Sequence, residues 1–175
     1  MIKNWLFFVM IVMAVGVTAQ EDNKVVYDSA AQQNILIGKC DWEAFQQDDF
    51  SDWFNEGYNA YHPDEKLMQQ LARSLKGREL SFKVYQGSWC PDSRRELPRL
   101  KKITDGLKSD VYTDIISLNR AKRLNNNALP EDNIEFVPTI VIYLDGVEVG
   151  RIVEEPDYSL EADIVKYLKA ELNEE

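Results

Sequence analysis

Cys90 has the clearest capacity for chemistry in this sequence, because of the residues on either side of it. The apolar run from Leu80 to Tyr85 comes before it and predicts a buried strand. Apolar residues at helical spacing follow it from Leu97 to Leu107 and predict a helix. A cysteine at this junction lies at a helix N-terminus, where unpaired N–H groups and the helix dipole favour the thiolate over the thiol. Pro91 suits the first helical turn, so we predict a reactive thiol rather than a packing residue.

The stretch Trp-Cys-Pro-Asp-Ser at residues 89–93 resembles the Trp-Cys-x-x-Cys motif of the thioredoxin superfamily. Pro98 matches the proline that kinks the active-site helix of that family. Val137-Pro138-Thr139 resembles its cis-proline loop, and the run from Ile140 to Val149 resembles the hairpin that follows the loop. The resemblance covers Leu80 to Leu172. It implies an α/β, thioredoxin-like fold, in which a central mixed sheet is flanked by helices, here with an N-terminal helical extension.

Three features depart from the family pattern. Ser93 stands in place of the second motif cysteine. Val84 stands in place of the buried acidic residue that relays protons in the family. The chain before residue 80 has no counterpart in the minimal fold. These departures leave the fold expectation intact but change the chemistry that the motif can perform.

The resemblance implies that Cys90 attacks a disulfide and forms a mixed disulfide with its substrate. Ser93 cannot resolve that intermediate, although its hydroxyl can donate a hydrogen bond to the Cys90 thiolate. Asp92 disfavours the thiolate by like charge, whereas Arg94 and Arg95 favour it. We expect a modestly acidic thiol.

The same resemblance implies a substrate-binding surface beside the thiol. Trp89 and Pro91 flank Cys90, and Trp89 is expected to be a platform for the substrate. The backbone of Val137 is expected to pair with an extended substrate chain, next to a cis bond at Pro138. The partners expected at this surface are proteins that carry disulfides or thiols.

Release of the mixed disulfide has three candidate routes, because the motif holds a single cysteine. An external small-molecule thiol or a reductase can resolve it, which gives a monothiol catalyst. Cys40 can resolve it, or form a structural or regulatory disulfide with Cys90, if the fold brings the two together. If nothing resolves it, the domain is a non-catalytic binding module that recognises a peptide or a partner protein.

Residues Met1 to Ala19 are predicted to be a signal peptide. Lys3 supplies the positive charge, Trp5 to Val17 is the apolar region, and small residues precede Gln20. The apolar region is shorter than the ~20 residues that span a bilayer, so stable membrane insertion is not expected after cleavage. We expect an exported protein, periplasmic or extracellular, with residues 20–34 as a flexible leader.

Composition argues against several other functions. The net charge is −10, without a basic patch, so nucleic acid is not an expected partner. One histidine and two cysteines do not make a closed zinc site, and no metal or cofactor is expected. His62 stands beside a turn proline, outside any catalytic pattern.

Residues 35–79 are expected to form the extension. A short strand is predicted within Asn34–Lys39. Asp49 is predicted to cap a helix whose aromatic residues form one stripe, and His62-Pro63-Asp64 to start a second helix that stops at Gly77. The stripe, which is expected to be core with a lid beside Cys90 as the alternative, comprises Phe50, Trp53, Phe54, Tyr58 and Tyr61.

Residues 80–172 are expected to form the thioredoxin-like core, with strand and helix alternating from Leu80. Val111 to Leu118 is predicted to be the second strand. Asn119 to Glu135 is predicted to be a short helix and a loop. Asp145-Gly146 signals a hairpin turn, and Tyr158 to Leu172 has the spacing of a final helix that packs on the sheet.

Overall fold

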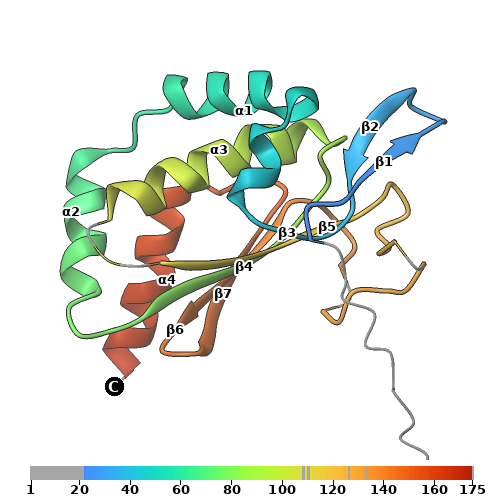
Figure 1. The fold of residues 1–175 in the computed structure, drawn as a ribbon. Helices are drawn as coiled ribbons and strands as arrows, with labels where there is room; N and C mark the ends of the chain where they lie inside the picture. The colour runs from blue at the N-terminus through green and yellow to red at the C-terminus, as the bar shows by residue number, and fades with distance from the viewer. Residues whose placement is uncertain (1–21, 108, 110, 126, 133, 175) are drawn as a thin grey trace, which may run out of the picture.

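The computed structural model describes residues 22–107, 109, 111–125, 127–132 and 134–174 (Figure 1). The predicted signal peptide lies outside these residues. In chain order the elements are β1 (Val25–Asp28), β2 (Gln33–Leu36), β3 (Gly38–Cys40), a 3₁₀ turn η1 (Trp42–Gln46), α1 (Asp48–Ala60), α2 (Glu65–Ser74), β4 (Leu80–Gln86), α3 (Pro91–Gly106), β5 (Tyr112–Ser117), β6 (Thr139–Leu144), β7 (Val147–Val153) and α4 (Leu160–Glu174).

Five strands form one mixed sheet in the order β3-β5-β4-β6-β7. β4 and β5 are parallel, and the other neighbouring pairs are antiparallel. The β6–β7 hairpin turns at Asp145 and Gly146, whose φ angles of 51° and 80° suit the tight turn that the Asp-Gly pair predicts. The expected mixed α/β architecture, with helices flanking a central sheet, is therefore confirmed.

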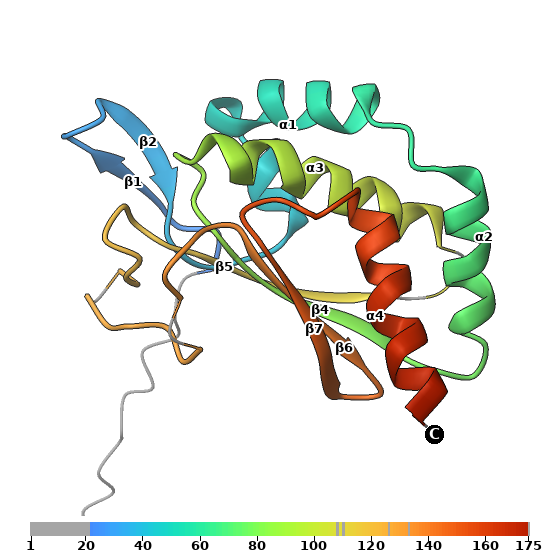
Figure 2. The ribbon, with the colours of Figure 1, turned by 180° about the vertical axis from the view of Figure 1, so that it is seen from behind.

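The four helices gather on one face of this sheet (Figures 1 and 2). Residues from all four helices belong to one buried apolar cluster with alternate residues of the strands, among them Phe82, Val84, Ile115 and Ile142. α1 lies over α3 as a further layer. A Cβ atom on Gly57 of α1 would lie 2.7 Å from the Pro98 ring in α3, so glycine permits this close approach.

The opposite face of the sheet carries the connection between β5 and β6. A second, smaller cluster lies here; it contains Tyr85, Cys90, Leu118, Ile134 and Val137. The helix predicted within Asn119–Glu135 is wrong for the part of that segment that the structure describes, which forms turns. The Asn119 side chain accepts hydrogen bonds from the N–H groups of Ala121 and Arg123, and this local bonding competes with a helix.

The region expected to be a flexible leader contains structure from residue 22 onward. β1 and β2 pair as an antiparallel hairpin. Its turn is organised by Asp28, whose carboxylate accepts hydrogen bonds from the N–H groups of Ala30 and Ala31. β3 then joins the main sheet as an edge strand next to β5. The extension is therefore part hairpin, part sheet and part helix, whereas the sequence patterns indicated helices and one short strand.

The helices of the extension follow the predicted pattern with one shift. α1 begins at Asp48, so Asp49 lies in the first turn and not at the N-cap. Asp64 caps α2 by accepting hydrogen bonds from the N–H groups of Lys66 and Leu67. Phe50 and Phe54 of the aromatic stripe are buried, as expected for core residues. No helix in the described part of the chain is long and apolar enough to cross a membrane.

Candidate functional site

Cys90 lies where β4 gives way to α3. β4 ends at Gln86, a tight turn follows, and Cys90 is the N-cap residue of α3, with Pro91 as the first helical residue. The Cys90 N–H donates to the Gly87 carbonyl at 2.8 Å, and the Cys90 carbonyl accepts from the Arg94 N–H at 3.0 Å. The sulfur is therefore at the N-terminal end of a sixteen-residue helix, where the backbone presents positive partial charge.

The Cys90 side chain is more buried than the sequence indicates, with 7% of the residue exposed. Its thiol donates a hydrogen bond to the carbonyl oxygen of Val137 at 3.2 Å. The Val137–Pro138 peptide bond is cis, as the loop sequence leads one to expect. The burial has a physical cause, because the chain between β5 and β6 folds back onto this end of the sheet and brings Leu118 and Ile134 into the same apolar cluster.

Ser93 has a different partner from the one expected. It is fully buried, and its hydroxyl oxygen accepts a hydrogen bond from the Gly87 N–H at 3.1 Å. None of the hydrogen bonds among the described residues joins Ser93 to the Cys90 sulfur. Ser93 therefore holds the turn before Cys90 in place. This contact could not be read from the motif, since it depends on the conformation of Gly87.

The charged side chains that flank Cys90 in the sequence have partners of their own in the structure. Asp92 is paired with Arg95 at 2.6 Å, which reduces the effect of its negative charge on the thiol. Arg94 donates from Nε to the Ser88 carbonyl at 2.6 Å and from a terminal nitrogen to Gln33 at 3.1 Å. Burial lowers the pKa of Arg94. These two hydrogen bonds hold the Arg94 guanidinium against the turn that leads into Cys90.

Trp89 lies beside the thiol with a defined orientation. Its ring nitrogen donates to the Leu118 carbonyl at 2.8 Å, and the ring packs against the Cys90 cluster. The side chains of Arg120 and Lys122 lie over the ring, 5.1 and 5.9 Å from its centroid. Gly87 makes room for this ring, because a Cβ atom there would lie 2.6 Å from it. The rim beside Cys90 is thus aromatic and locally basic in an acidic protein.

The N-terminal hairpin supports the motif, a role that sequence reasoning missed. The Leu36 N–H donates to the Ser88 hydroxyl at 2.9 Å, and this serine is fully buried. Asp28 of β1 accepts from Arg120 at 2.8 Å, which ties the hairpin to the rim over Trp89. No local sequence pattern predicts these contacts, since they join residues far apart in the chain.

Cys40 is not brought to Cys90. It lies in β3 opposite Ile115 of β5, with its sulfur 3.1 Å from the Ser117 hydroxyl, and both cysteines are free thiols. β5 separates β3 from β4, and strands lie ~4.8 Å apart, so β3 is about 10 Å from β4. Cys90 contacts Val137 on the β6 side of β4, farther still from β3. A disulfide needs Cα atoms within about 7 Å, so this arrangement does not allow one.

Burial raises the pKa of the Cys40 thiol to about 11, with the nearby Asp41 adding to the effect and the Ser117 hydrogen bond opposing it. At neutral pH this thiol keeps its proton. His62 is also remote from the motif, at the turn between α1 and α2, where its Nδ1 lies 2.9 Å from the Ala60 carbonyl. Within the described ranges, no group of histidine, cysteine and acidic side chains is arranged to hold a metal ion.

Comparison with known proteins supports the fold of this chain but gives no information on its activity. No family model and no curated protein matches the sequence. The structure is similar to that of a protein of unknown function from Pseudomonas aeruginosa, with a TM-score of 0.59 and 18% identity over 77% of this chain and 94% of the other. It is also similar to an HIV epitope scaffold, with a TM-score of 0.56 and 20% identity over 77% and 94% of the two chains. At these identities the likeness supports the mixed α/β fold alone.

Proposed function

We propose that this chain is an exported, thioredoxin-like thiol–disulfide exchange protein that acts through Cys90 alone. The observation that carries the proposal is the position of the Cys90 sulfur, at the start of α3 and against the carbonyl of Val137 beside a cis-proline. The strand order β3-β5-β4-β6-β7, with β4 and β5 parallel, supports the family assignment that the motifs suggest. The export signal rests on the sequence of residues 1–19.

The chemistry begins with the Cys90 thiolate, which attacks one sulfur of a substrate disulfide. A new bond forms between Cys90 and that sulfur, and the second substrate sulfur leaves with the electron pair and takes up a proton. The helix N-terminus and Arg94 favour the attacking thiolate through their positive charge. The product is a mixed disulfide, with no net change in oxidation state.

The Val137 carbonyl has a part in this step. In the free protein it accepts the Cys90 thiol hydrogen, which holds the sulfur against the loop. An extended substrate chain that pairs with the backbone of Val137 donates its own N–H to that carbonyl and releases the thiol for ionisation. Substrate binding and activation of the sulfur are then coupled through a single acceptor. Trp89 provides the flanking wall of the same site.

Resolution of the mixed disulfide comes from outside the molecule. Ser93 has no thiol and is bonded to Gly87, and Cys40 lies across the sheet with its pKa raised to about 11 by burial. An external thiol, either a small molecule or the thiol of a reductase, therefore attacks one of the two sulfurs of the mixed disulfide. Attack on the substrate sulfur frees Cys90 as the thiolate, whereas attack on the Cys90 sulfur frees the substrate and leaves a new mixed disulfide that a second external thiol reduces. This makes the protein a monothiol catalyst.

The test is disulfide exchange with oxidised glutathione at neutral pH, followed by intact-mass measurement. The wild type is expected to form one glutathione adduct, which Cys90→Ser abolishes and Cys40→Ser leaves in place. Adduct formation that survives Cys90→Ser, or that depends on Cys40, would refute the proposed role of the motif cysteine.

A non-catalytic binding module is the second candidate, and the 7% exposure of Cys90 is the observation that favours it. In that case the surface beside Val137 recognises an extended chain and the sulfur contributes only packing. The two candidates separate with Cys90→Ala: a peptide that binds the wild type keeps its affinity for the variant if the protein only binds.

A further inference from the structure

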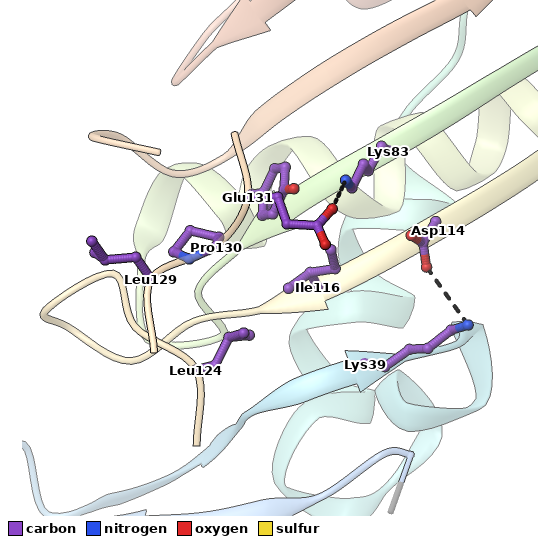
Figure 3. Close-up of a pocket in the computed structure, with 9 residues that line it drawn as sticks. Lys39, Lys83, Asp114, Ile116, Leu124, Leu129, Pro130 and Glu131 are labelled. Atoms are coloured by element: carbon purple, nitrogen blue, oxygen red, sulfur yellow. Dashed lines mark ion pairs between the residues drawn. The ribbon is translucent and has the colours of Figure 1, made fainter. Parts of the chain in front are cut away.

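A pocket of about 360 Å³ opens on the face of the sheet that the helices leave free. Side chains of three neighbouring strands form its floor, and the connection between β5 and β6 forms its wall (Figure 3). Its volume falls within the range of about 300–1,000 Å³ that is usual for small-molecule sites. The residues that line it are Lys39, Lys83, Tyr85, Asp114, Ile116, Leu124, Leu129, Pro130 and Glu131.

The basic groups of the pocket already have acidic neighbours. The Lys83 ammonium lies 3.2 Å from a carboxylate oxygen of Asp132 and 3.6 Å from one of Glu131. Hydrogen bonding to Tyr85 and to Asp132 raises the pKa of Lys83, although burial opposes this. An anionic ligand at Lys83 would meet two carboxylates that already hold the cation. The pocket is therefore not built for an anion.

The acidic group on the floor is incompletely satisfied. Asp114 Oδ1 is buried and has no hydrogen-bond partner within the part of the chain that the structure describes. Its nearest cation, Lys39, lies 4.0 Å away, which is too far for a hydrogen bond (Figure 3). A buried acceptor without a donor costs about 1–3 kcal/mol, and more when it is charged. The site therefore calls for a hydrogen-bond donor.

The remaining walls are apolar and can hold a hydrocarbon body. Ile116 lies on the floor, while Leu124, Leu129 and Pro130 come from the connecting segment. Leu129 is 63% exposed, so its side chain is available to contact a ligand in the pocket. A ligand that lies beneath it would bury this surface.

We propose that this pocket binds a small primary amine that carries an apolar body. The ammonium pairs with the Asp114 carboxylate, whose side chain is 28% exposed, and the body lies between Ile116 and the side chains of Leu124 and Leu129. The proposal stands apart from the thiol chemistry, because none of its polar contacts involves Cys90. Tyr85 belongs to the Cys90 cluster and Ile116 packs against it, so the pocket and the Cys90 site share these two side chains.

The experiment is a titration with phenethylamine, followed by ¹H–¹⁵N correlation spectra of the full mature chain. Saturable shifts are expected in residues 112–118 and 124–131. Two molecules of matched shape serve as comparisons: 2-phenylethanol, which lacks the charge, is expected to bind at least about tenfold more weakly, and 3-phenylpropionate, which reverses it, is expected not to bind. Absence of shifts with the amine, or tighter binding of the acid, would overturn the proposal.

Variants test the assigned contacts. Asp114→Asn is expected to weaken phenethylamine binding by at least about tenfold, since it removes the charged acceptor. Glu148→Gln, an exposed carboxylate of β7 paired with Arg151, is the matched control and should leave the affinity unchanged. Leu129→Ser, at an exposed position that folding does not need, is expected to weaken binding by loss of apolar contact. Unchanged affinity in both Asp114→Asn and Leu129→Ser would place the ligand elsewhere and refute the assignment.

Discussion

Cys90 and Cys40 are both free thiols, but they lie in two regions of the molecule with different surroundings. Cys90 ends the turn after β4, where α3 begins, and its neighbours include the Arg94 cation and the Val137 carbonyl. Cys40 lies inside the edge strand β3, beside the Ser117 hydroxyl and the Asp41 carboxylate. Both residues are nearly inaccessible to solvent, at 7% and 4% exposure. Burial alone therefore does not distinguish them.

The difference lies in the backbone. Cys90 is the N-cap residue of α3 and its side chain makes no capping hydrogen bond, whereas Cys40 lies within a strand that pairs with β5. At Cys40 desolvation outweighs the opposing hydrogen bond with Ser117, and the pKa of the thiol rises to about 11. The two cysteines therefore differ in the backbone around them and not in their exposure.

The largest expected effect is a gain of function at the motif. Ser93→Cys restores a second thiol one helical turn from Cys90, where it can resolve the mixed disulfide within the molecule. We expect insulin reduction by dithiothreitol to accelerate by roughly 100-fold over the wild type, because an intramolecular thiol acts at a high effective concentration. Turbidity of the reduced insulin chains measures the rate.

Ser88→Cys is the matched control for that gain, since it adds a thiol to the same buried turn but before Cys90. It should give no acceleration. A wild-type rate in Ser93→Cys would mean that the motif does not support dithiol chemistry even when it is complete.

Alkaline pH tests how the Cys40 thiol contributes to the stability of the folded protein. Its pKa is raised in the folded protein from 9.0 to about 11, so the folded form keeps a proton that the unfolded chain loses. This contribution to stability is fully present below pH 9 and is lost as the pH rises toward 11. It amounts to about 2–3 kcal/mol, at 1.36 kcal/mol for each pKa unit.

Urea unfolding at pH 7, 9 and 11 measures that loss, with Cys40→Val as the comparison. Burial also raises the pKa of Tyr85 to about 12, which destabilises both proteins above pH 10. The wild type should therefore lose about 2–3 kcal/mol more than the variant. Parallel losses in the two proteins would contradict the assignment to Cys40.

A smaller effect is expected at Gly87. A methyl group there would lie 2.6 Å from the Trp89 ring, so Gly87→Ala must displace the ring from its contact with Leu118. We expect a loss of about 1–3 kcal/mol in the free energy of unfolding and a shift in tryptophan fluorescence. Gly106→Ala is the control, because its methyl group would meet only the flexible end of Met68 and would favour the helix. Equal stability of Gly87→Ala and the wild type would contradict the described packing.

The smallest effect concerns the basic rim over Trp89. Lys122→Glu reverses a charge that lies 5.9 Å from the ring centroid, near the path of an approaching disulfide. Reaction of Cys90 with the anionic 5,5′-dithiobis(2-nitrobenzoate) should slow by about two- to fivefold at low salt, while reaction with neutral 4,4′-dithiodipyridine should not change. A similar change with both reagents would mean that the rim acts through structure and not through charge.

Apart from the connection between β5 and β6, the fold from Leu80 onward could be predicted because its signals are local. The apolar run of β4, the Asp145-Gly146 turn and the spacing of Leu160, Ile164 and Leu168 each report on nearby residues only. The last helix begins at Leu160 rather than Tyr158, an ordinary boundary shift. Cys90 at the helix start followed from the same local reading.

The rest of the site could not be predicted, because it depends on contacts between distant segments. Ser88 is bonded to Leu36, and Arg120 to Asp28, through a hairpin that looked like a polar leader. The partner of Ser93 depends on the turn at Gly87, and the burial of Cys90 depends on a connection that forms turns rather than a helix. Polar composition alone does not reveal such tertiary bonding.

The most direct test is competitive alkylation of the mature, reduced protein with iodoacetamide at neutral pH, read by peptide mass spectrometry at both cysteines. We expect Cys90 to be labelled faster than free cysteine under the same conditions, while Cys40 stays unlabelled until the protein unfolds. Labelling of Cys90 at or below the rate of free cysteine would contradict an activated motif thiol. Labelling of Cys40 before Cys90 would contradict it as well.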